Sequence, residues 1–281
     1  MHRGWNPTRR NRNIGTSKQG YGQNNHLVIP KSWPDDRVFW EVLHKPIVIQ
    51  EKIGEYELTF LLEPPRPECF YPCTVTDVMS VLDYVPQSDL EGLELIIFRQ
   101  PTRKQDQLHP VWGRFLYYAT PGSYSGPAVC IEAHNLKQTL RWPLSLQPDS
   151  QDELARLEAD GHRIEKGRRD YTIHRTYESV RNTVLFRTLF HEIGHYVDWM
   201  QSVIRPGLDT NSDAEDARLN QAFDSKPSQD KEAFAHRYAQ TLADHMCQAG
   251  QIPFPPQPTS EILLAKGLEL DWFQPGASRL L

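Results

Sequence analysis

Apolar and polar positions in the first half of the chain follow the patterns of β-strands. In five segments, apolar residues alternate with polar ones or form short runs between turn residues: 45–52, 56–63, 93–100, 112–119 and 126–134. Gly54 marks a turn between the first two strands. The Gly/Pro/Ser-rich segment 120–127 predicts that the last two strands form a β-hairpin.

Helical spacing first occurs over residues 74–85, where Val75, Val78, Met79 and Leu82 recur on one face. Thr74 or Thr76 could cap this helix. The segment that precedes it, 64–73, is rich in proline and is expected to be a loop.

A long helix is predicted over residues 177–203 and is expected to end at Pro206-Gly207. One stripe runs along it at steps of three and four: Val180, Val184, Thr188, His191 and His195. A second helix is predicted over residues 229–248, with Ser228 as its N-cap and Asp230 in its first turn.

The other segments of the second half have weaker patterns. Residues 149–170 are charged and are expected to form a surface helix or an excursion. Residues 209–230 are acidic and polar, which favours a loop. A proline-rich linker at 252–258 precedes a short amphipathic helix at 260–270.

Strands precede helices in this order, which is typical of an α+β fold. We divide the chain into a disordered basic tail (1–26), an N-terminal extension packed on the main part (27–89), a main domain (90–250), and a proline-rich linker with a C-terminal helix (251–281).

Composition excludes several classes of protein. Hydrophobic residues at 38% and charged residues at 24% are typical of a globular chain and not of a disordered one. A net charge of −5 argues against a general binder of nucleic acid or anionic membranes, although a weak contact through the basic tail is left open. The start lacks the apolar segment of a secretory signal, and no stretch approaches a membrane span. A cytoplasmic location is expected, with export by a non-classical route as the alternative.

The four cysteines give a weak signal for metal or disulfide chemistry. Cys69 and Cys73 are separated by three residues, and no second pair follows to complete a four-ligand zinc site. A Cys69–Cys73 disulfide is not indicated, and reduced thiols are expected for all four residues.

His191-Glu192-Ile193-Gly194-His195 is the strongest chemical signal in the chain. Residues four apart project from one face of a helix, so two imidazoles can bind one metal ion, and Glu192 lies close enough to act on a water that the metal holds. Composition alone predicts about 0.03 such motifs in a chain of this kind, so chance is a poor explanation. Gly194 costs the helix about 1 kcal/mol relative to alanine, which makes sense if backbone or substrate comes close there.

A catalytic zinc ion needs a third protein ligand. The downstream candidates are Asp209, Asp213, Glu215, Asp216, Glu232, His236 and His245. Glu232 is favoured because it opens a rigid helix, and the small Ala233 and Ala235 would let that helix pack closely on the motif helix. His236 lies four residues after Glu232 and could be a ligand, a partner of a ligand or a donor to the transition state.

These residues resemble the gluzincin metallopeptidases, most closely the group of the anthrax lethal factor catalytic domain. The matching segments are His191–His195 and the Glu-x-Phe-Ala pattern at Glu232-Ala233-Phe234-Ala235, and the resemblance covers about residues 90 to 248. It implies a zincin-like fold, with a small mixed sheet followed by an active-site helix and a third-ligand helix. It also implies one Zn²⁺ per chain, held by His191, His195 and Glu232.

The resemblance is incomplete at one catalytic position. The lethal-factor group has a tyrosine seven residues before the third ligand, where this chain has Ser225. Tyr196, His236 and Tyr238 are the nearest substitutes in sequence, and His236 is ranked first. Asp198 could orient a ligand imidazole or be an ordinary surface acid.

The expected function is hydrolysis of peptide bonds in a protein or peptide substrate, more by an endopeptidase than by an exopeptidase. Glu192 is the expected general base and His236 the expected second catalytic residue, and the substrate would lie along an edge strand at 126–133. The alternatives are a zinc hydrolase of a non-peptide amide and a zincin-fold binding or regulatory protein without turnover. The oligomeric state is left open.

Overall fold

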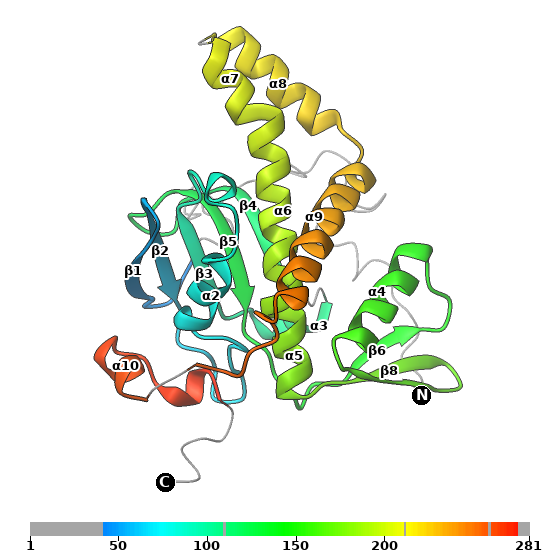
Figure 1. The fold of residues 1–281 in the computed structure, drawn as a ribbon. Coiled ribbons are helices and arrows are strands. Elements are labelled where there is room, and N and C mark those ends of the chain that lie inside the picture. Colours follow the sequence, from blue (N-terminus) through cyan, green and yellow to red (C-terminus); the bar gives the residue numbers. More distant parts are fainter. Residues whose placement is uncertain (1–41, 109–110, 211, 258–259, 275–281) are drawn as a thin grey trace, which may run out of the picture. The chain divides into compact units, whose positions relative to one another are not determined.

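The protein is described by a computed structural model over residues 42–108, 111–210, 212–257 and 260–274. The predicted basic tail, residues 1–26, lies outside the described residues. All described residues belong to one compact unit, and their strands precede most of their helices, which confirms the predicted α+β class (Figure 1).

A five-stranded mixed sheet forms the first part of the fold. Its order is β1 (Ile47–Ile53), β2 (Tyr56–Leu62), β3 (Leu95–Arg99), β5 (Gly126–Glu132) and β4 (Gly113–Ala119). The three central strands run parallel, while β1 and β4 pair antiparallel at the two edges. The five predicted strands and the β4–β5 hairpin are confirmed. The predicted domain boundary near residue 90 falls within this sheet, between β2 and β3.

The prediction that residues 126–133 form an edge strand is wrong. That segment is β5, which lies between β3 and β4, and β4 is the edge. Every side chain of β5 is buried except Pro127, whereas most of β4 is half-buried or exposed. The continuous apolar run of β5 is typical of a strand covered on both faces, and its sequence does not say which neighbour is outermost.

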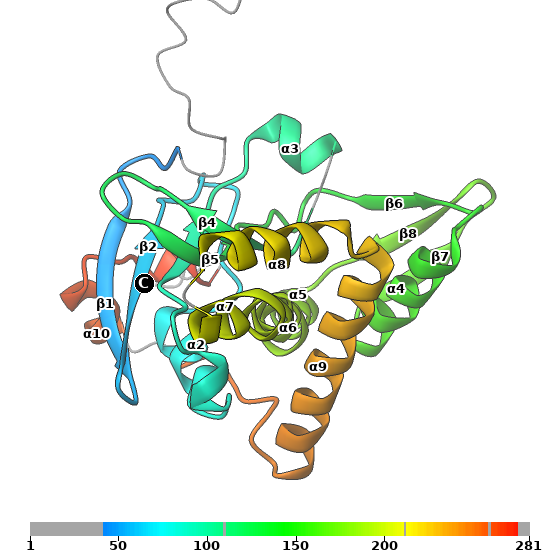
Figure 2. The ribbon, with the colours of Figure 1, turned by 90° about the horizontal axis from the view of Figure 1, so that it is seen from above.

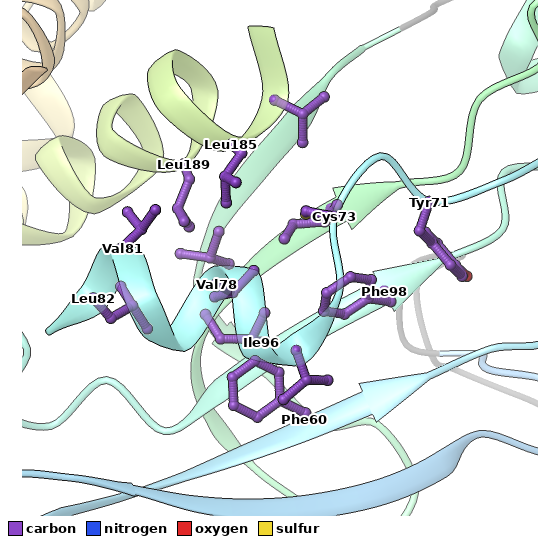
Figure 3. Close-up of a cluster of buried hydrophobic side chains, with 14 of the residues drawn as sticks. Phe60, Tyr71, Cys73, Val78, Val81, Leu82, Ile96, Phe98, Leu185 and Leu189 are labelled. Carbon is purple, nitrogen blue, oxygen red and sulfur yellow. The ribbon is translucent and has the colours of Figure 1, made fainter. Parts of the chain in front are cut away.

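Helix α2 (Val75–Leu82) packs on one face of the sheet. Thr74 caps it through a capping box with Asp77, which confirms the first of the two predicted caps. Its apolar face meets strands and helices that are distant in sequence: Val78 lies between Ile96 of β3 and Leu185 of the long helical run (Figure 3). This core fixes the motif-bearing helices on the sheet.

A small antiparallel sheet follows, with the order β6 (Leu140–Pro143), β8 (Asp170–His174) and β7 (Arg163–Lys166). Helix α4 (Pro148–Ala159) lies between β6 and β7 in sequence, so residues 149–170 contain both the predicted surface helix and a strand. The three strands were not predicted because they are short and carry few apolar residues. Helix α3 (Arg103–Leu108) and the 3₁₀-helix η1 (Gln87–Asp89) complete the connections.

The long helix runs further than the sequence predicted. It consists of α5 (Tyr177–Thr183), η2 (Val184–Thr188), α6 (Leu189–Trp199), η3 (Met200–Ile204) and α7 (Arg205–Thr210). Pro206 and Gly207 do not end it. Pro206 lies inside the run, directly after the π-helical segment η3, and the helix continues past it to Thr210. The segments η2 and η3 are π-helical and flank α6, which carries the motif.

Most of the predicted acidic loop at 209–230 is helical. Helix α8 (Asp213–Ser225) has a polar surface and one buried side chain, Phe223, so its apolar stripe is too narrow to see in the sequence. Helix α9 (Ser228–Gln248) begins as predicted with Asp230 in its first turn, but Pro227 is its N-cap and Ser228 its first residue. The predicted C-terminal helix is shorter, α10 (Ser260–Ala265), and is followed by η4 (Leu270–Trp272).

Candidate metal centre

The candidate centre lies where α6 and α9 cross (Figure 2). A Cβ on Gly194 would lie 2.9 Å from the Cα and 3.0 Å from the carbonyl oxygen of Ala235, closer than real Cβ atoms can normally approach. The absence of a side chain at Gly194 and the small methyl of Ala235 therefore allow the two helices to touch. This confirms the close approach expected at both positions.

The crossing brings together three side chains that can bind a metal. The Nε2 atoms of His191 and His195 are 3.0 Å apart, and the Glu232 carboxylate is 3.2 Å from the first and 3.6 Å from the second. Tetrahedral ligands about 2.0–2.1 Å from a zinc ion are about 3.3 Å apart, so this donor set fits zinc in size and in chemistry. Among the described residues, these three make up the group of histidine and carboxylate side chains that could hold a metal ion.

The three ligand candidates share a strong electrostatic coupling. Hydrogen bonds with His191 and His195 hold the pKa of Glu232 well below its ordinary value. Burial lowers the pKa of His195, but Glu232, Glu192 and Asp198 outweigh this effect, and the net pKa is raised. The carboxylate therefore stays ionised and provides the negative charge that a divalent cation requires.

Glu192 lies beside the triad but is not part of it. Its side chain is 8% exposed and points toward β4, where it makes a hydrogen bond with the backbone of Phe115. Burial raises the pKa of Glu192, against the opposing effects of His191 and His195. A raised pKa makes this carboxyl group a better proton acceptor than an exposed glutamate.

The edge strand β4 approaches the motif closely because Gly113 has no side chain. A Cβ there would lie 2.9 Å from the Thr188 methyl group, and also against the backbone of Cys130. A cleft of about 310 Å³ lies between β4, α6 and the start of α9. Its lining consists of Gly113, Arg114, Phe115, Tyr117, His191, Glu192, His195, Ser228, Lys231 and Glu232.

Tyr117 of β4 is not among the three residues that the sequence suggested as substitutes for the missing tyrosine, Tyr196, His236 and Tyr238. It lines the cleft, and its ring packs against Trp199 of α6 and Phe223 of α8. Burial raises the pKa of its phenol, as do Asp198, Asp224, Glu232 and Glu192. Only the placement of β4 at the sheet edge reveals this residue, because 74 positions of sequence separate it from the motif.

His236 lies next to the candidate metal ligands but does not line the cleft. Its ring packs against that of His191, with centroids 4.4 Å apart, and it lines a separate groove along α9. Burial and the neighbouring His191 lower its pKa to about 4, so it is neutral at pH 7. Its predicted catalytic role stays a prediction.

The other substitutes for the missing tyrosine have partners elsewhere. Tyr196 donates to the carbonyl oxygen of Glu91, and Tyr238 donates to Asp89 at 3.0 Å. Asp198 accepts two hydrogen bonds from Lys226, at 2.6 and 2.8 Å, and so joins α6 to the turn before α9. Within the described residues, Asp198 makes no hydrogen bond with His191 or His195.

All four cysteines are free, as expected. Cys69 and Cys73 are buried without forming a disulfide, and burial raises the pKa of both thiols. Cys73 packs in the apolar core, whereas Cys69 accepts a hydrogen bond from the Arg66 guanidinium at 3.5 Å. Neither belongs to the group of possible metal ligands among the described residues. Asp213, Glu215, Asp216 and His245, which the sequence offered as alternative ligands, are not part of the triad.

Comparisons with protein-family models, with curated proteins and with solved structures found no match. In the part of the chain that the structure describes, no helix is both long enough and apolar enough to cross a membrane.

Proposed function

We propose that the protein is a zinc-dependent metallopeptidase, with His191, His195 and Glu232 as the zinc ligands. The observation that carries the proposal is the position of Glu192. Its buried carboxyl group lies directly beside three converging metal ligands and faces a cleft. A purely structural metal site needs no such acid, because its ligands are closed around the ion.

In the proposed reaction, bound zinc and Glu192 would have separate roles. Bound zinc would lower the pKa of a water molecule and polarise the carbonyl of the scissile bond. Glu192 accepts a proton from that water and passes it to the leaving amine. The backbone of Phe115 holds the carboxyl in place, and burial raises its pKa, which favours uptake of the proton from the water.

An extended peptide fits the cleft better than a compact small molecule. No strand of the described residues pairs with the outer edge of β4, which lines the cleft beside Glu192. A peptide can therefore add to the sheet as a further strand, with its backbone hydrogen-bonded to β4 and one carbonyl near the zinc ligands. This favours a peptide over the non-peptide amide that the sequence left open.

Two groups could stabilise the negative charge that develops on the carbonyl oxygen. Tyr117 lines the cleft with Glu192 and Glu232, and its hydroxyl group makes no hydrogen bond among the described residues. His236 contacts the outer side of the His191 ring. We favour Tyr117, since a donor must point at the reacting oxygen and Tyr117 shares the cleft.

The experiment is cleavage of a mixed peptide library, followed by mass spectrometry, with the zinc-loaded protein. We expect cleavage that stops with a chelator and returns when zinc is restored. Bound zinc without any cleavage, or cleavage that a chelator leaves unchanged, would instead favour the binding or regulatory alternative.

A further inference from the structure

Two small adjoining pockets lie at the carboxyl ends of β3 and β5, beside the small sheet. They share Val111, His134, Leu140 and Arg175, and their volumes are about 30 and 50 Å³. We propose that they form one binding site for a carboxylate carried on a short apolar group, held by Arg175 and His134. The proposal does not rest on the peptidase function.

The charges that line the first pocket leave one cation without an acid. Arg99 and Arg114 share the buried Glu132, with Arg99 at 3.0 Å and Arg114 at 3.2 Å. Asp106 has its own partner, the guanidinium of Arg66. Three arginines and two acids therefore line the pocket, which is a surplus of one positive charge. Arg175 forms no ion pair with either acid, although Asp106 lies near enough to oppose the lowering of its pKa by burial.

Arg175 is a largely buried cation whose hydrogen-bond partners among the described residues are neutral. One terminal nitrogen donates to the backbone oxygens of Asn135 and Gln138. Its Nε atom is buried and has no hydrogen-bond partner among the described residues. Burying a charge without an opposite charge is costly, and a carboxylate in the pocket would offset this cost.

His134 supplies a second donor to the same space. Its side chain is 7% exposed, and its Nε2 atom is buried without a hydrogen-bond partner in the described chain. The ring packs against Trp112, with centroids 5.0 Å apart, which fixes its orientation. Burial and the charge of Arg175 lower its pKa to about 3, so at pH 7 it is neutral and can donate one hydrogen bond.

The size and lining of the pockets define the ligand. A water needs roughly 10–15 Å³ of such space, so the polar pocket has room for about two oxygen atoms, as in a carboxylate. The second pocket is lined mainly by apolar side chains, among them Trp112, Trp142 and Leu157. A branched aliphatic acid matches both pockets, with its carboxylate in the polar one and its alkyl group in the apolar one. A phosphate would be too large and too highly charged for the polar pocket.

Two sources could supply such a group: a free small acid and the C-terminal residue of a peptide. Arg114 lines both this pocket and the cleft beside Glu192, so a peptide could reach the site from the cleft. The two sources share their chemistry and differ in what is attached to the carbon next to the carboxylate.

Isothermal titration of the zinc-loaded full chain tests the site. The probes are 4-methylpentanoate and N-acetyl-leucine, each compared with its amide. We expect at least one acid to bind in the millimolar range or better, and its amide to bind at least tenfold more weakly. Tighter binding of 4-methylpentanoate indicates a free acid, and tighter binding of N-acetyl-leucine indicates a peptide C-terminus. Equal binding of acid and amide, or no saturable binding, overturns the proposal.

A carboxylate could also bind zinc, so variants are needed to show whether the acid binds in the two pockets or at the metal centre. Arg175→Gln should weaken acid binding about 10- to 100-fold. His134→Phe, which keeps a ring against Trp112, should weaken it about tenfold. Arg141→Gln, an exposed arginine of β6, is the matched control and should bind normally. If Glu232→Ala abolishes binding while His134→Phe and Arg175→Gln retain it, the acid binds at the metal centre and the proposal is wrong.

Discussion

Gly194 of α6 lies against the backbone of Ala235 of α9, in a gap too narrow for a Cβ atom. His191 and His195 are on the same helix as Gly194, and Glu232 is on the same helix as Ala235. The contact therefore sets the distance between the two imidazoles and the carboxylate. Gly194 therefore permits the close contact between the two helices, although glycine destabilises a helix relative to alanine.

Gly194→Ala should weaken zinc binding. The new methyl group meets the Ala235 backbone, which cannot rotate away, so α9 and Glu232 must shift. We expect the zinc affinity to fall about 10- to 100-fold, as for other changes that disturb ligand orientation. Competition with a metal-binding dye measures it.

Gly207→Ala is the matched control, because it adds a methyl group to the same helical run. There the nearest atom is the carboxylate end of Asp216, which can rotate aside. Equal zinc affinities for the Gly194→Ala variant, the control and the unchanged protein would show that the helix contact does not position the ligands.

Glu232→Ala should empty the zinc site, since it removes the ligand contributed by α9. We expect the metal content, measured by mass spectrometry of the purified protein, to fall from about one zinc ion per chain to a small fraction. Asp230→Ala, in the same turn of α9, should keep its zinc. Full occupancy in Glu232→Ala would point to another third ligand, with His236 the nearest candidate in the structure.

Tyr117→Phe and His236→Phe separate the two candidate donors to the oxyanion. Each substitution keeps a ring and removes the polar group. We expect Tyr117→Phe to lower kcat about 10²- to 10³-fold with little change in KM, because the hydroxyl acts in the transition state. The same loss in His236→Phe, with Tyr117→Phe unaffected, would restore the sequence-based assignment to His236.

The strands and helices of the core were predictable because each carries a clear apolar repeat. The candidate metal ligands His191 and His195 were predictable because their spacing on one helix fixes their geometry, and Glu232 because it lies at the start of the next predicted helix. Several features were not, among them the small sheet β6–β8–β7, the continuation of the long helix past Pro206, β4 as the edge strand, Tyr117 in the cleft, and helix α8. Strand order depends on long-range pairing, which a local pattern does not contain. A helix with one buried side chain, Phe223, has no visible stripe.

The stability of the protein should fall below neutral pH because of His162. This histidine is 2% exposed and forms hydrogen bonds with Thr183 (2.9 Å) and Ser179 (3.1 Å). Burial and nearby arginines lower its pKa to about 4, while an unfolded histidine has a pKa of about 6.5. The unfolded state therefore takes up a proton first, and the contribution of His162, complete above pH 6.5, is lost as the pH falls toward 4.

Urea unfolding at about pH 7.5 and pH 5 measures this effect. The unchanged protein should lose about 2 kcal/mol more than His162→Gln between the two values. His245→Gln, an exposed histidine near the end of α9, is the control and should lose as much as the unchanged protein. If the free energy of unfolding falls by the same amount in all three proteins, His162 is not the source of the pH dependence.

The most direct test of the proposed mechanism is the rate at which the Glu192→Gln variant cleaves peptides. Glutamine keeps the size of the side chain and removes the basic carboxylate, so the fold and zinc content should stay unchanged. Peptide cleavage should fall by a factor on the order of 10² to 10⁴, the usual contribution of a general base. Glu215→Gln, on the exposed surface of α8, should cleave normally. A zinc-loaded Glu192→Gln variant that cleaves peptides at the rate of the unchanged protein would contradict the catalytic role of Glu192 and the proposed mechanism.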